Sequence, residues 1–84
     1  MNENRTHTEE FHVNGEQLLA KIKELIHEGN IRRIIIKNKE GKTIMEIPLT
    51  IGVVGVVLAP TLAAVGAIAA LVSEATVVVE KIEE

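Results

Sequence analysis

Three histidines are the residues of this sequence best suited to bind a metal or to transfer a proton. His7, His12 and His27 are the only imidazoles, and the chain has neither Cys nor Asp. A metal site needs a cluster of carboxylates or imidazoles at ligand spacing. His7 and His12 are five residues apart, which suits neither a strand face nor a helix face, while Lys23 and Glu24 precede His27 by one helical turn. We expect surface histidines, no metal site and no cofactor.

The carboxylates give little support for catalysis. Glu46 and Glu80 fall in predicted strands and could meet across a sheet, where paired glutamates act as acid and base if their pKa values are pushed apart. The alternative, which we favour, is that both point to water or pair with Lys42 and Lys81. Ser73 is the only serine and lies outside any nucleophile-elbow sequence. We therefore expect no catalytic residue and a protein that is not an enzyme, with no small-molecule substrate.

Five basic residues between positions 31 and 42 are the candidate contacts for an anion. They are Arg32, Arg33, Lys37, Lys39 and Lys42, and Glu40 alone opposes them, so the local charge is 5 − 1 = +4. Such a cluster could contact phosphates or anionic lipid headgroups. The whole chain carries −3 and a single aromatic residue, which makes nucleic acid an unexpected partner. We favour the alternative that these charges keep an isoleucine-rich strand from pairing with other chains.

A run of 27 residues from Ile47 to Ser73 contains no charged side chain. Uncharged runs of this length are transmembrane candidates by default. Small residues recur in it at a spacing of four, which lets helix backbones approach closely. A helix that is apolar all round is buried all round, by protein or by lipid. The predicted self-association residues are Val54, Leu58, Ala59, Leu62, Ala63, Gly66, Ala67 and Ala70.

The first elements that would carry these residues are a weak strand and a helix. Residues 6–13 have β-branched residues but little apolar surface. Residues 14–29 are predicted to hold an amphipathic helix over 15–28. Asn14 and Gln17 have the spacing of a capping box, apolar residues recur at helical spacing, and a glycine follows the helix end as a C-terminal cap.

A β-hairpin is predicted over residues 31–48, with strands at 31–38 and 42–48. Its isoleucines are β-branched, which suits a pleated surface. Gly41 can adopt the positive φ that the turn needs, and Pro48 ends the ladder because it cannot donate a hydrogen bond.

The apolar segment 49–73 is predicted to be helical. Thr50 can cap a helix over residues 51–58, with a break near Ala59 and a second helix that starts at Pro60 and ends at Val72. A strand at 51–57 is the alternative, because valine and glycine are poor helix formers.

A valine-rich strand at residues 75–82 completes the predicted order β-α-β-β-α-β. This order indicates an α+β fold with helices on one face of an antiparallel sheet. A ferredoxin-like arrangement is possible, although it would place the polar segment 6–13 in the centre. We expect the 84 residues to form one domain, with residues 1–5 frayed.

Several blocks of this sequence carry a family resemblance. They are Glu28–Asn38, Gly41–Thr43, Ile47–Gly55, Leu58–Pro60 and Ala63–Leu71. Together they resemble a small prokaryotic family known as the domain of unknown function numbered 4342, over about residues 14–82. The family brings no activity, cofactor or catalytic residue, so the resemblance implies a non-catalytic module.

Two hypotheses of function follow. In the first, the protein self-associates through residues 49–72 into a closed homo-oligomer or a filament, and exposed strand edges could add β-pairing. In the second, the apolar segment enters or docks on a membrane, with the basic hairpin on the anionic cytoplasmic face. Residues 1–10 are polar and lack the apolar core of a signal peptide. We expect a cytoplasmic protein, with membrane association under the second hypothesis.

Overall fold

Six elements follow one another in the predicted order. The structure is a computed structural model that describes residues 6–49 and 54–82, with side chains of the second part described from Pro60 onward. The elements are β1 (Thr6–Asn14), α1 (Gly15–Ile26), β2 (Ile31–Asn38), β3 (Thr43–Pro48), α2 (Val54–Leu71) and β4 (Glu74–Ile82). This confirms the predicted α+β class and its β-α-β-β-α-β order.

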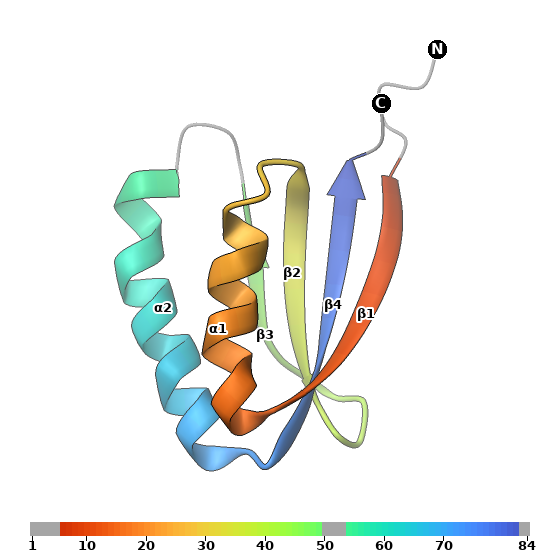
Figure 1. The fold of residues 1–84 in the computed structure, drawn as a ribbon, viewed down its shortest axis with the longest axis vertical. Helices are drawn as coiled ribbons and strands as arrows, with labels where there is room; N and C mark the ends of the chain where they lie inside the picture. Colours follow the sequence, from red (N-terminus) through yellow and green to blue (C-terminus); the bar gives the residue numbers. More distant parts are fainter. Residues whose placement is uncertain (1–5, 50–53, 83–84) are drawn as a thin grey trace.

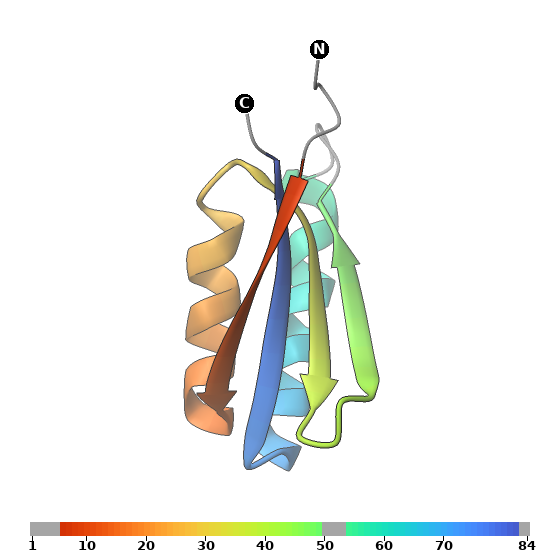
Figure 2. The same ribbon diagram turned by 90° about the vertical axis from the view of Figure 1, so that its right-hand side faces the viewer.

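The four strands form one antiparallel sheet in the order β1-β4-β2-β3. Both helices lie on the same face of this sheet, and the other face is open (Figures 1 and 2). The first strand is therefore at an edge and the last is internal, unlike the ferredoxin-like arrangement. Composition explains this order, since Val77, Val78 and Val79 in β4 are buried on both faces of the sheet, whereas β1 is mostly polar.

The core lies between the sheet and the helices. Its fully buried larger side chains come from α1, β2, β4 and α2, and they are Leu18, Ile22, Leu25, Ile34, Ile36, Val65, Val77 and Val79. Each side chain of this size stabilises the fold by about 1.5–3 kcal/mol when it is removed from water. Most of α1's apolar stripe therefore serves the core.

Helix α1 begins with the predicted capping box. Asn14 Oδ1 accepts from the Gln17 backbone N–H at 2.8 Å, and Gln17 Oε1 accepts from the Asn14 N–H at 3.3 Å. The helix ends at Ile26, two residues earlier than predicted, because His27 is its C-terminal cap and donates its N–H to the carbonyl of Glu24. Gly29 follows with φ of +83°.

Helix α2 is continuous through Pro60, so the predicted break near Ala59 is wrong. The alternative strand over 51–57 is also wrong for residues 54–57, which are helical, while 50–53, with the Thr50 cap, lie outside the described residues. A proline removes one backbone hydrogen bond without ending the ladder on either side. Pro60 is exposed, so a carbonyl freed on that side can be hydrated.

The N-terminus of α1 and the C-terminus of α2 touch at Gly15. Its N–H donates to the carbonyl of Ser73 at 3.2 Å. A Cβ at this position would meet the backbone carbonyl oxygens of Val72 and Ala69, the latter at 2.6 Å. The close contact of the two helices therefore requires glycine here, a constraint that no local sequence pattern indicated.

Candidate functional site

The outer side of α2 is the most unusual surface of the described molecule. Val65 on the inner side is fully buried, and Leu62, Ile68 and Ala69 pack against the core. We call the opposite side the outer face of α2; its members are Ala63, Ala64, Ala67, Ala70 and Leu71, all exposed. Leu71 is 87% exposed. The outer face thus presents a row of small apolar side chains that ends in one large one.

The predicted self-association residues divide between the two sides of the helix. Ala63, Ala67 and Ala70 share the outer face, because spacings of four and three return to one side of a helix. Leu62 instead packs on the core. The side chains of Val54, Leu58 and Ala59 lie outside the described part of the chain.

Gly66 lies half-buried between these two sides. A Cβ built at this position would meet no atom within 4 Å. Neither α1 nor the sheet therefore needs a glycine here, in contrast to Gly15.

The open face of the sheet holds an ion cluster that corrects one sequence interpretation. Glu46 and Glu80 pair with neither of the predicted lysines. Both meet Arg33, whose Nε lies 3.1 Å from Glu46 Oε2 and 3.7 Å from Glu80 Oε1. Arg33 and Glu80 face each other across β2 and β4. The two carboxylates therefore share one cation and do not contact a lysine as predicted.

The five predicted anion contacts do not gather at one place. Arg33 is occupied by two carboxylates. Arg32 is exposed and lies five residues from Lys37 along β2, a separation of about 16 Å in a strand. Lys39 and Lys42 sit at the hairpin turn, where Asn38 Oδ1 accepts from the Glu40 and Lys42 N–H groups. An anion at the turn would therefore meet at most part of the set.

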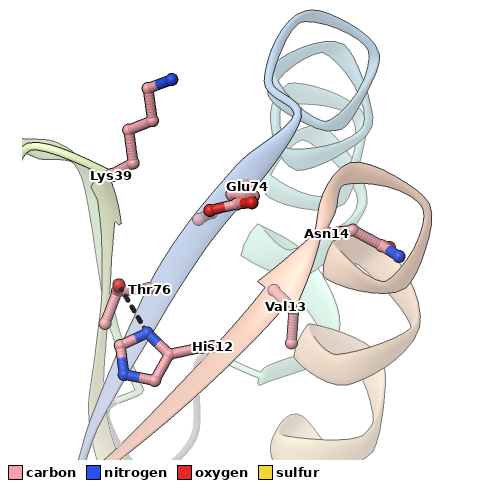
Figure 3. Close-up of a pocket in the computed structure, with 7 residues that line it drawn as sticks. His12, Val13, Asn14, Lys39, Glu74 and Thr76 are labelled. Atoms are coloured by element: carbon pink, nitrogen blue, oxygen red, sulfur yellow. Dashed lines mark hydrogen bonds between the residues drawn. The ribbon is translucent and has the colours of Figure 1, made fainter.

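A hollow of about 430 Å³ opens beside this turn (Figure 3). His12 Nδ1 shares a hydrogen bond of 3.2 Å with Thr76 Oγ1 in its wall. Lys39 and Glu74 bring opposite charges to its rim. Within residues 6–49 and 54–82, no three His or Glu side chains gather as metal ligands would. The hollow has no convergent set of donors that would select one ligand.

Lys81 joins β4 to β1 and to the turn that follows α1 through a second ion cluster. Its Nζ lies 3.1 Å from Glu28 Oε1 and 3.2 Å from Glu9 Oε1, and the lysine side chain is 16% exposed. Hydrogen bonds from His7 and then Lys81 lower the pKa of Glu9. Glu28 and then Glu9 raise the pKa of Lys81. Through these ion pairs the cluster links segments that are distant in sequence.

Comparison with known proteins gives the chain a family. The model of the domain of unknown function DUF4342 matches residues 4–81. The chain belongs to the DUF4342 family. This confirms the resemblance seen in the sequence and adds no activity to it. The search of curated proteins and the search of solved structures each gave no match.

None of the helical residues that the structure describes forms a segment with the length and hydropathy needed to cross a bilayer.

Proposed function

We propose that this protein is a non-enzymatic module that self-associates, with the outer face of α2 packed against the same face of a second copy. The observation that carries the proposal is that the rest of the subunit covers α2 on one side only. From Pro60 to Leu71 every exposed side chain is apolar. Contiguous apolar surface of this kind on a folded protein marks an interaction site.

Small side chains favour a second copy as the occupant of this face. Ala63, Ala67 and Ala70 leave a nearly flat surface, which lets two helix backbones approach closely. The same surface on both subunits makes a two-fold, self-complementary contact. The face carries no charge, so no like-charge repulsion opposes the pairing.

Gly66 adds a second line of support. A glycine inside a helix destabilises it by about 0.5–1 kcal/mol relative to alanine. Nothing in the described subunit needs its small size. A helix from another subunit that passes close to Gly66 would explain why the position lacks a side chain.

A lipid surface fits this helix less well than protein does. Helices that lie in the membrane interface carry lysine or arginine on one side and bulky residues such as Trp, Phe and Leu on the other. Residues Val54–Leu71 contain neither a charge nor an aromatic residue. We therefore favour protein as the cover, and the experiment below includes lipid as an outcome.

Light scattering on a size-exclusion column tests the proposal. Without detergent, we expect wild type to be larger than the 9.2 kDa chain. Ala67→Glu places a charge in the outer face and should lower the mass of the assembly, while circular dichroism stays unchanged because Ala67 is exposed. Thr43→Glu adds the same charge at an exposed position of β3 and should have no effect.

Two results would overturn the proposal. One is a 9.2 kDa wild-type species at every concentration tested. The other is wild type that floats with lipid vesicles and leaves them only in detergent, which would identify lipid as the cover of α2.

A further inference from the structure

The two edges of the sheet differ in how they are protected. Natural edge strands are kept short, twisted by bulges, or interrupted by proline and lysine. β3 has six residues, ends at Pro48 and faces a register shift between Ile36 and Lys37. β1 has nine residues, contains no proline, glycine or lysine, and pairs with β4 without any shift in register. Charge protects this edge only through Glu9, which is paired with Lys81, and Glu10. Figure 2 shows β1 as the edge strand on the viewer's side.

A groove of about 610 Å³ runs along the β1 edge beneath α1. Phe11 forms part of its wall and is only half-buried, with Lys21 Nζ 4.1 Å from the centre of its ring. Ala20 of α1 also lines the groove and is exposed. A small residue at this position leaves room for a second element beside α1.

We propose that β1 pairs with β1 of a second copy, antiparallel and with Phe11 opposite Phe11, so that two sheets become one of eight strands. A two-fold axis perpendicular to the sheet relates the copies and keeps all helices on one side. Side chains along a strand alternate between the two faces of the sheet. Two directly opposed residues share a face, so their residue numbers must be both odd or both even. The allowed registers are therefore those centred on a single residue.

Charge and the number of paired residues select the register centred on Phe11. In this register Glu10 of each copy lies opposite His12 of the other copy, on the open face of the sheet. Registers centred on Glu9 or Glu10 would instead set a carboxylate against its own copy, and opposed like charges destabilise a sheet. The registers centred on Thr8 and on His12 each pair only five residues of each strand, from 6 to 10 and from 10 to 14. The favoured register pairs seven, from 8 to 14.

This contact is independent of the outer face of α2. β1 and α2 lie on opposite sides of α1 (Figure 1), so either contact can form without the other. If both form, two different two-fold interfaces alternate along a chain of subunits, which gives an open filament unless the geometry closes.

Cysteine cross-linking tests the register, and the absence of native cysteine makes each engineered thiol unique. Directly opposed residues of an antiparallel pair have Cα atoms about 4.5–5.5 Å apart, within the range that a disulfide bridges. Phe11→Cys should therefore form a covalent dimer on mild oxidation. Residue 13 lies on the same face of β1 as residue 11, but in this register the two copies of residue 13 are offset by four residues, about 13 Å along the strands. Val13→Cys should therefore stay monomeric on a non-reducing gel.

A mixed experiment leaves Phe11 and the core untouched. Glu10 and His12 are both exposed, so Glu10→Cys and His12→Cys should fold, and the mixture should cross-link severalfold more than either variant alone. The same yields in an Ala67→Glu background would show that the β1 contact survives loss of the α2 contact. No heterodimer above the single-variant background, or equal cross-linking by Val13→Cys and Phe11→Cys, would overturn this inference.

Discussion

Gly15 and Gly66 are both helical glycines, yet their surroundings differ. Gly15→Ala would push a methyl group into the carbonyls of Ala69 and Val72, and overpacking of this kind typically costs about 1–3 kcal/mol. Gly66→Ala enters open space and gains about 0.5–1 kcal/mol of helix propensity. We expect Gly15→Ala to lower the free energy of unfolding in urea and Gly66→Ala to raise it.

The comparison belongs in an Ala67→Glu background, so that the contact between the outer faces of α2 does not contribute. In the wild-type background, Gly66→Ala should in addition weaken the assembly, since the added methyl group separates the two α2 helices. Destabilisation by both changes in the Ala67→Glu background would mean that Gly66 is packed inside the subunit.

The Lys81 cluster makes stability depend on pH at both extremes. The pKa of Glu9 is lowered in the folded state, so its contribution is present above the ordinary glutamate pKa and is lost as the pH falls through the lowered value. The pKa of Lys81 is raised, so its contribution is lost as the pH rises through that value. We expect the free energy of unfolding to decrease as the pH is lowered below about 4. Lys81→Met should make this decrease shallower. Lys42→Met, at the exposed turn, should leave the acid limb unchanged.

Some residue contacts follow from local sequence and others do not. The Asn14–Gln17 capping box and the positive φ of Gly41 were predictable, because each depends on residues a few positions apart. The two carboxylates on Arg33 were not, since they come from β3 and β4 and meet only when β2 lies between these strands. The choice of Lys42 and Lys81 as their partners failed because it assumed neighbours near in sequence.

At the scale of elements, α2 shows how a single residue can mislead. Pro60 suggested two helices, but the backbone hydrogen bond that a proline removes does not end this helix. Because the helix is continuous, Pro60→Ala restores that bond, and a proline in a helix interior costs up to about 3 kcal/mol. We expect a higher melting temperature and slightly greater helical ellipticity. An unchanged melting temperature would mean that the helix gains nothing from the restored bond.

The strand β1 was the element least evident from sequence. Its weak apolar pattern is that of an edge strand with a polar open face, in which the apolar residues Phe11 and Val13 pack against the core. Its position at the edge depends on the pairing with β4, at the other end of the chain. No local pattern encodes such a pairing.

At the scale of the whole molecule, the sheet brings the first and last strands together. Thr6 faces Ile82, and Phe11 faces Val77, which is 66 positions later in the chain. The fold class followed from the order of elements, whereas the strand order did not, because it is fixed by contacts between such distant segments.

This pairing has a kinetic consequence. Contacts between distant positions slow folding, because a large loop must close before they form, so the β1–β4 ladder should form late. A circular permutant with residue 84 joined to residue 1, and opened between the exposed Glu28 and Gly29, turns that ladder into a local hairpin. In stopped-flow refolding, in the Ala67→Glu background, we expect the permutant to fold severalfold faster than the natural order, and a slower permutant would place the rate-limiting step elsewhere in the sheet.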